Sequence, residues 1–414
     1  MDKSTTNERF GQIPEITQSL DALAREGARR MIQAALKLEV EQYIQKMNYL
    51  RDEQEHAMVV RNGKSHPRTV HLGSGAVEIV APRVHDRRPK ERFASKILPP
   101  YMRRSPQLSE ALPVLYLRGL STGDFSEAIP ALLGTNAAGF SASTITRLLN
   151  VWQDEYKGWR KRALEGKTYI YVWADGVYFN IRLGEEDRLA GLVLIGVLPD
   201  GSKEVIALED GYRESTASWA SLLRDLKQRG MPAPKLAIGD GALGFWAALR
   251  DVFPETKEQR CWVHKNANVL DKLPKRVQPR AKDMLHEIMY APDRQSALED
   301  IESFKKQFEA KYPKAVETLT KNQNQMLTFF DFPAEHWLHL RTTNAIESAF
   351  STVKARTKQT KGAGSRKAGL AMAFKLLLAA EKRWRRLNAP HLVALVQADA
   401  TFLDGEWQMS DRDI

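Results

Sequence analysis

The chain has 414 residues, of which 43% are hydrophobic and 27% charged, which is room for two or three domains with buried cores. It contains no apolar run of about 20 residues, which a membrane span needs, and its N-terminus lacks the pattern of a secretory signal. Its only cysteine is Cys261, which excludes an intrachain disulfide and a four-cysteine zinc site. We therefore expect a soluble protein of the cytoplasm that has no membrane partner.

The charge of the chain favours a polyanionic partner. Lysine and arginine number 62 against 51 aspartates and glutamates, a formal net charge of +11. Cations that neutralise DNA phosphates release bound counterions, which drives association. The basic residues gather in the runs 157–167, 354–367 and 381–387. Each run fits either a nucleic-acid contact or an ordinary solvated face.

The N-terminal quarter combines helical and β patterns. Apolar residues in 17–48 follow a helical spacing, which predicts one long helix or a pair of helices. Two β-rich segments, 69–72 and 76–80, are joined by a glycine-containing turn and predict a small hairpin. Basic residues flank it, and Arg61 and Arg83 are candidate DNA contacts. We expect residues 1–104 to bind a DNA end.

Residues 105–166 form a second predicted region. The pattern up to residue 156 indicates three short helices, and Ser141 or Ser143 would cap the last one. Such a unit is either a helix-turn-helix or an ordinary helical packing unit. In a helix-turn-helix the last helix reads the major groove, and Thr144 and Arg147 would then contact DNA.

The next part alternates strands and helices. Three consecutive strands are predicted at 169–183, 189–201 and 203–212, with a break in the first near Asp175. A helix at 215–230, a strand at 235–240, a helix at 241–254 and a strand at 257–264 follow. This order describes an α/β fold of the ribonuclease H-like type, a mixed sheet with helices on its faces. Residues 265–340 return to helical spacing and predict an all-α insertion, after which a further helix at 341–357 leads back to the core. The predicted catalytic core thus comprises 167–264 and 341–400, and a mainly helical DNA-binding region precedes it.

Three acidic residues are candidates for metal-dependent chemistry. Asp175 and Asp240 are predicted at strand ends and Glu347 on the helix after the insertion. Carboxylates that converge at one edge of a sheet bind Mg²⁺ or Mn²⁺, and two such ions stabilise the attacking and leaving oxygens of a displacement at phosphorus. Taken singly, an aspartate before glycine is also typical of a turn or a helix cap.

Several longer segments carry a resemblance to a known family. They are RNG (61–63), APR (81–83), ADGVYFNIR (174–182), GDGALGFWAAL (239–249), QRCWVHKNANVLDKLPK (259–275) and LRTTNAIESAFSTVKARTKQTKG (340–362). In this order they make the chain resemble the mutator-type transposases of bacterial insertion sequences, a branch of the DDE transposases, over nearly its whole length.

The resemblance implies an activity and its components. Asp175, Asp240 and Glu347 match the family's catalytic and metal-binding triad, with two Mg²⁺ or Mn²⁺ ions as cofactors. The implied reaction hydrolyses one strand at the terminal inverted repeat of the element, and the 3′-OH set free attacks a target phosphodiester. The implied partners are double-stranded DNA, both element ends and target, and a second copy of the chain in a homodimer. The implied location is the bacterial cytoplasm, on the nucleoid when bound to DNA.

Further residues are expected near this site. Cys261 and His264 match a Cys-x-x-His pair of the family, which is either half of a zinc site or a packing and hydrogen-bonding pair beside the active site. No second pair with ligand spacing follows, so we predict no zinc. Arg341, Thr343 and Asn344 precede Glu347 and would orient its carboxylate or touch a DNA phosphate. The alternative for Thr343 is a helix cap.

Beyond Glu347, Lys354 and Arg356 are predicted to contact the DNA backbone. Two other functions remain open from the residues: a metal-dependent nuclease or resolvase on the same core, which cuts and never joins, and a catalytically silent DNA-binding repressor. The presence of all three acids argues against the repressor.

Overall fold

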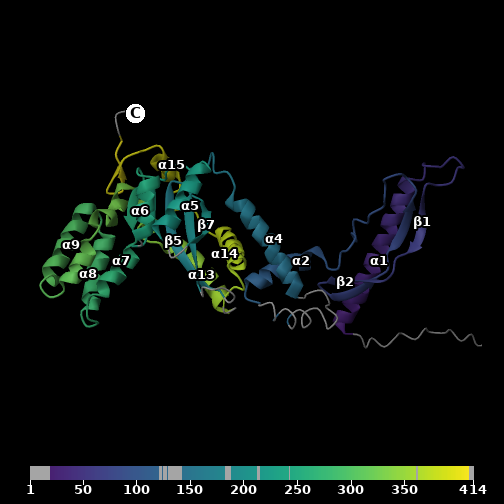
Figure 1. The fold of residues 1–414 in the computed structure, drawn as a ribbon, viewed down its shortest axis with the longest axis horizontal. Coiled ribbons are helices and arrows are strands. Elements are labelled where there is room, and N and C mark those ends of the chain that lie inside the picture. Colours follow the sequence, from purple (N-terminus) through teal and green to yellow (C-terminus); the bar gives the residue numbers. More distant parts are fainter. Residues whose placement is uncertain are drawn as a thin grey trace, which may run out of the picture. The chain divides into compact units, whose positions relative to one another are not determined.

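The computed structural model describes residues 19–120, 124, 128, 142–181, 188–211, 215–241, 243–359 and 362–409 (Figure 1). The chain divides between Thr146 and Arg147 into two compact units. Among the described residues, no helix combines the length and the apolar character that crossing a bilayer requires. The middle one of the three helices predicted in 105–156 lies outside the described residues except for Asp124 and Ala128, and so does the candidate cap Ser141.

The first unit consists of a helix on two strand pairs. It contains α1 (Leu20–Lys46), β1 (Val59–Lys64), β2 (Arg68–Leu72), β3 (Gly75–Ile79), β4 (Pro82–Asp86) and α2 (Pro106–Leu117). The segment at 17–48 is therefore one helix, and the Ser19 side chain caps it by accepting from the Ala22 amide. The hairpin of β2 and β3 is confirmed. The antiparallel pair of β1 and β4 was not expected.

The second unit is built on a mixed sheet. Its first elements are α4 (Ala142–Arg160), β5 (Tyr171–Asn180), β6 (Arg188–Val197), β7 (Lys203–Gly211), α5 (Thr216–Gln228), β8 (Leu236–Gly239), α6 (Leu243–Val252) and β9 (Lys257–Arg260). The strand order is β7-β6-β5-β8-β9. Strands β5, β6 and β7 are antiparallel, whereas β8 is parallel to both β5 and β9.

Helices cover both faces of this sheet, because successive residues of each strand point to opposite sides. Val172 and Ala174 of β5 belong to the core cluster beneath α5 and α6, together with Trp219 and Trp246. The opposite face is covered by α13 (Asn344–Gln359) on β5 and α14 (Arg366–Glu381) on β7. Figure 1 shows the two helix pairs on either side of the strands.

The predicted helical stretch between β9 and α13 is helical in the structure. It contains α7 (Trp262–Leu270), α8 (Gln278–Tyr290), α9 (Arg294–Phe308), α10 (Pro313–Thr320), α11 (Gln323–Met326), the 3₁₀ helices η1 (Thr328–Asp331) and η2 (Ala334–His336), and α12 (Trp337–Leu340). After α14 follow α15 (His391–Gln397), β10 (Phe402–Leu403) and β11 (Glu406–Trp407).

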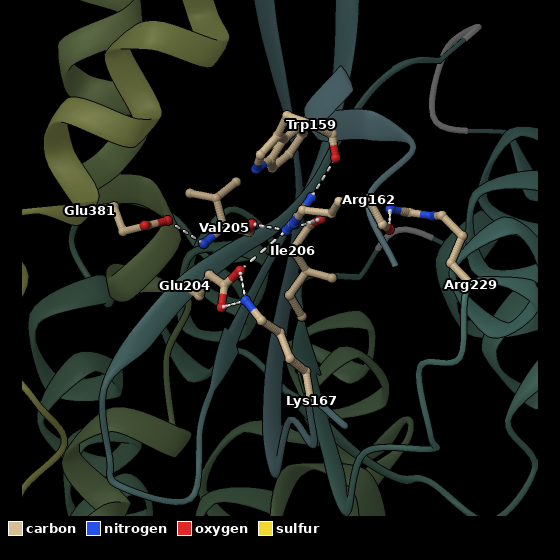
Figure 2. A network of polar contacts seen from close by, with 8 residues as sticks. All are labelled: Trp159, Arg162, Lys167, Glu204, Val205, Ile206, Arg229 and Glu381. Carbon is tan, nitrogen blue, oxygen red and sulfur yellow. Dashed lines mark hydrogen bonds and ion pairs between the residues drawn. The ribbon is translucent and has the colours of Figure 1, made fainter. Parts of the chain in front are cut away.

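Side chains close the edge strand β7. Arg162 lies over the Trp159 ring and donates from Nη2 to the carbonyls of Val205 and Ile206, at 2.9 and 3.1 Å. From the other side the Glu381 carboxylate accepts from the Val205 amide at 2.7 Å (Figure 2). The pairing of β6 with β7 is irregular at this point. The bonds therefore satisfy edge groups that would otherwise be open to another strand.

Three sequence-based expectations need correction. Strand β5 continues through Asp175, which pairs with Val193 of β6, so the aspartate does not end the strand. The last strand of the sheet ends at Arg260, and α7 begins at Trp262. In α4, residues from Arg147 onward belong to the second unit, where Trp152 and Tyr156 are buried. This part of α4 was assigned to the DNA-binding region.

Candidate functional site

Asp175 and Asp240 occupy equivalent positions on neighbouring strands. The parallel pairing of β5 with β8 ends at Ala174 and Gly239, and each aspartate is the next residue. Adjacent strands lie about 4.8 Å apart, so the two backbones are close where the carboxylates begin. Asp175 follows Tyr171 and Trp173 at intervals of two residues, which turns it to the sheet face covered by α13.

Glu347 approaches this face from the first turn of α13. The apolar side of the helix, with Ile346, Phe350 and Val353 fully buried, fixes it against the sheet. The segment before the helix is tied to the strands as well, because the Trp173 indole donates to the Thr342 carbonyl at 3.2 Å. Glu347 is only partly buried, with 38% of its side chain exposed. It is accessible to a ligand.

Thr343 is the hydrogen-bonding centre beside Glu347. Its Oγ1 lies 2.5 Å from Glu347 Oε1, 3.2 Å from Cys261 Sγ and 3.4 Å from His264 Nδ1. A hydroxyl has one proton, and the shortest distance assigns it to the Glu347 carboxylate. The Thr343 amide donates separately to Cys261 Sγ at 3.3 Å.

Cys261 and His264 lie at the start of α7 and contact this group. A hydrogen bond with Cys261 raises the pKa of His264 to about 9, against the effect of burial, and the charges of Glu347 and Asp240 act in the same direction as the bond. Burial alone would raise the pKa of Cys261, but hydrogen bonds from His264 and Thr343 lower it. The imidazole Nδ1 lies 3.8 Å from Glu347 Oε1, so the protonated ring forms an ion pair with this carboxylate.

The ligand atoms of Cys261, His264 and Glu347 lie within 4.8 Å of one another. Of the three predicted acids, only Glu347 belongs to this group. Thr343 connects the three side chains by hydrogen bonds, and the same three ligand atoms are close enough to hold one metal ion. Both roles of the Cys-x-x-His pair therefore stay predictions.

The backbone at Asp240 is held by the next strand and helix. The Trp246 indole and Arg260 Nη1 both donate to the Asp240 carbonyl, at 2.8 and 3.2 Å. Trp246 and Trp262 are buried in the core, at 1% and 0% exposure.

Some of the predicted DNA contacts lie on the first unit and on α4. Arg61 and Arg83 are exposed on β1 and β4, and Gly63 adopts a φ of +64° where the pairing of these strands is irregular. Arg147 is exposed on α4, while the structure describes only the backbone of Thr144. The first unit and this helix remain candidates for DNA contact.

The structure changes the reading of two arginines. Arg341 is buried and donates to the carbonyls of Trp337 and Met289, at 3.2 and 2.6 Å, so it joins α12 to the end of α8 and does not face Glu347. Arg356 is 2% exposed and cannot reach a DNA backbone from this position. Asn344 and Lys354 are exposed on α13, where a DNA contact is open to both.

Sequence reasoning anticipated one residue of the site and overlooked another. Thr343 was expected either to orient Glu347 or touch a DNA phosphate, or else to cap the helix, and its hydroxyl lies against the Glu347 carboxylate, as residues four apart on a helix face each other. Arg260 was absorbed into a predicted strand. In the structure its Cζ lies 4.5 Å from the centre of the Trp246 ring. No sequence pattern predicts this buried contact.

Known proteins match the chain over most of its length. A family model described as "Transposase, Mutator family" matches residues 1–386. The transposase for insertion sequence element IS6120 of Mycolicibacterium smegmatis is 56% identical over 307 residues, 74% of this chain and 94% of the relative. The transposase for element IST2 of Acidithiobacillus ferrooxidans is 48% identical over 287 residues, 67% of this chain and 94% of the relative.

Among solved structures, the Drosophila P element transposase strand transfer complex covers 71% of this chain and 91% of its own, with 10% identity. Its TM-score of 0.22 is too low to show a shared fold. The family model, by contrast, spans residues 1–386, a range that includes the three acids, and the two bacterial relatives are 56% and 48% identical to this chain. The chain therefore belongs to the Mutator family of transposases.

Proposed function

We propose that the protein binds the terminal inverted repeats of its insertion sequence, cleaves one strand to free a 3′-OH, and joins that end to target DNA. Asp175, Asp240 and Glu347 are the proposed catalytic acids. The observation that carries the proposal is the pairing of β5 with β8, which brings Asp175 and Asp240 to equivalent positions on the side of the sheet where α13 supplies Glu347.

We infer a ribonuclease H-like core. Three antiparallel strands followed by two parallel ones, with helices on both faces and a helical stretch between the last strand and α13, support this inference. In open α/β sheets, ligands bind outside the carboxyl ends of the strands, where Asp240 follows β8.

The donor atoms suit Mg²⁺ or Mn²⁺. Asp175, Asp240 and Glu347 offer carboxylate oxygens, which these hard cations prefer, and all three side chains are partly exposed. When bound, two such ions supply electrostatic stabilisation to the attacking and leaving oxygens. In the proposed site Thr343 orients the Glu347 carboxylate, and a protonated His264 balances part of its charge.

The nucleophiles of the proposed reaction are water and then the 3′-OH of the cut strand. No covalent protein–DNA intermediate is required, because neither step uses a side-chain nucleophile. Two element ends must meet before joining, so we propose a homodimer as the working unit, bound to double-stranded DNA.

The test is a cleavage and joining assay with labelled duplex carrying the element end and Mg²⁺. Asp175→Asn, Asp240→Asn and Glu347→Gln should each abolish both products while leaving end binding intact, since binding rests on phosphate and groove contacts made elsewhere. Asp283→Asn, a change of the same type at an exposed position of α8, serves as the matched control and should be active.

Other outcomes identify the rival functions. Cleavage without any joined product would indicate a nuclease or resolvase. End binding without cleavage, with Mg²⁺ and with Mn²⁺, would indicate a repressor. Loss of folding in the acid variants would remove the support for their catalytic role.

A further inference from the structure

A groove of about 510 Å³ opens beside the candidate acids. Gly241, which follows Asp240, lies in its wall, and so do Cys261 and His264, which contact the group around Glu347. The rest of the wall comes from Arg260, α7 and the region of α10. The groove thus leads from the acids along the helical stretch.

The wall of the groove is predominantly cationic. Its basic residues are Arg260, Lys265, Lys272, Lys314 and Lys321, against the two acids Asp271 and Glu317. Lys272, Lys314 and Lys321 are exposed. None of these three has an ion pair with another residue of the described chain. An anion entering the groove would meet cations without a prior partner.

Arg260 is the unusual member of this set. It is 7% exposed, and its Nε is buried without a hydrogen-bond partner. Within the described residues the guanidinium makes a single hydrogen bond, to the Asp240 carbonyl, and no ion pair. Burial lowers the pKa of Arg260 and so disfavours its charge, although the charges of Glu258 and Asp240 act in the opposite direction. A ligand anion in the groove would offset this effect of burial.

Lys265 has a different role. Its Nζ donates to the carbonyls of Thr318 and Lys321, at 2.8 and 2.7 Å, and so satisfies backbone groups at the end of α10. Burial, then the charges of Arg260 and Lys321, lower its pKa to about 8. Lys265 therefore holds α10 against α7, and the groove's available cations are Arg260 and the exposed lysines.

We propose that Arg260 binds a backbone phosphate of the DNA strand next to the scissile phosphate, and that Lys314 and Lys321 bind the same strand farther along the groove. A guanidinium is suited to phosphate oxygens by its planar set of donors. The volume of about 510 Å³ is that of a site for one small ligand, which is enough for a short stretch of one strand. The inference rests on the proposed function and adds the path of the strand.

The experiment uses end DNA in which one phosphate at a time is replaced by an uncharged methylphosphonate. Cleavage is measured with the wild type, Arg260→Gln, Lys314→Gln/Lys321→Gln and the control Lys282→Gln, an exposed lysine of α8 outside the groove. In the wild type, neutralising the phosphate that Arg260 contacts should slow cleavage roughly tenfold, as expected for a lost charged hydrogen bond.

The decisive result is that the effect of the Arg260 substitution and the effect of neutralising its phosphate do not add up. Arg260→Gln should cleave unmodified DNA roughly tenfold slower and show no further loss at the phosphate that Arg260 contacts, while remaining sensitive elsewhere. In the double lysine variant, neutralising neighbouring phosphates should no longer slow cleavage. The slope of its log binding constant against log salt concentration should fall by about one unit per lost phosphate contact. The Lys282→Gln control should retain the wild-type profile.

The proposal is overturned if neutralising each phosphate slows cleavage by Arg260→Gln as much as it slows cleavage by the wild type, even if the variant cleaves slowly overall. If Arg260→Gln does not fold, the double lysine variant decides in the same way, because both lysines are exposed. A wild type that does not cleave at all contradicts the proposed function instead. In that case, end binding measured on the same DNA series decides whether the groove holds a strand.

Discussion

The Thr343 hydroxyl donates a hydrogen bond of 2.5 Å to Glu347 Oε1, four residues later in the chain. The bond fixes one carboxylate oxygen and leaves the other to a ligand. Because Thr343 also contacts Cys261 and His264, it connects the Cys-x-x-His pair to the candidate acid. The pair and the acid are therefore expected to act as one unit.

Replacing Thr343 by valine removes this hydroxyl at nearly constant volume. We expect cleavage to fall about 10- to 100-fold, the usual effect of losing a partner that orients a metal ligand, and the Mg²⁺ concentration for half-maximal cleavage to rise. Thr343→Ser keeps the hydroxyl and should retain most activity. A Thr343→Val protein with wild-type Mg²⁺ dependence would show that the bond does not orient Glu347 for metal binding.

His336 should make stability depend on pH. It is fully buried, with Nδ1 2.9 Å from the Tyr171 hydroxyl, and burial lowers its pKa to about 4, whereas the unfolded value is about 6.5. Between these values the unfolded chain binds the proton and the folded chain does not. Stability is therefore complete above the unfolded value and falls as the pH drops through this window, by on the order of 3 kcal/mol.

Urea unfolding across this pH window tests the His336 assignment. His336→Gln should flatten the dependence, whereas His286→Gln, at an exposed position of α8, should leave it unchanged. An equally steep dependence in both variants would assign the effect to other groups.

Gly362 should tolerate no side chain. Its φ is +103°, and an added Cβ would lie 2.6 Å from the Asn180 carbonyl oxygen, which accepts from the Ala363 amide. Gly362→Ala should lower the free energy of unfolding by about 1–3 kcal/mol, the usual cost of such strain. Gly364→Ala is the matched control, because its added Cβ would meet no atom within 4 Å. Equal stability of the two variants in urea would contradict the prediction.

Arg162→Ala should weaken the β7 edge. It leaves the carbonyls of Val205 and Ile206 without their side-chain donor, at a cost of about 1–3 kcal/mol. It should also increase self-association, measured by light scattering, because unpaired edge groups recruit other strands. Arg224→Ala removes an exposed ion pair with Asp251 and should cost less than about 1 kcal/mol. Similar losses in both variants would show that the edge bonds contribute nothing special.

Much of the α/β order could be predicted, because the buried strands and amphipathic helices have clear periods. The break expected at Asp175 and Gly176 was wrong because pairing with Val193 and Leu192 of β6 overrides the turn preference of these residues. The pair of β1 and β4 was missed, since their sequences lack a clear alternation and Pro82 begins the second strand.

At the site, sequence could name the three acids and the Cys-x-x-His pair but not their surroundings. Arg341, Arg356 and Arg260 appear alike as basic residues near motifs. In the structure all three are buried, and only Arg260 lines the groove beside Asp240 and Gly241. Charge can be counted from a sequence, whereas burial depends on which distant elements pack together.

The side chains that close β7 have a counterpart at the opposite margin of the sheet, where Thr328 donates to the Glu258 carbonyl of β9 and the Phe329 amide donates to the Gln259 side chain. These contacts occupy part of each edge strand, so continuous intermolecular sheets through these edges are disfavoured. The proposed homodimer would consequently have to form through helical surfaces, through the first unit or through shared DNA. Binding of the element ends could then promote dimer formation while the sheet that carries Asp175 keeps its structure.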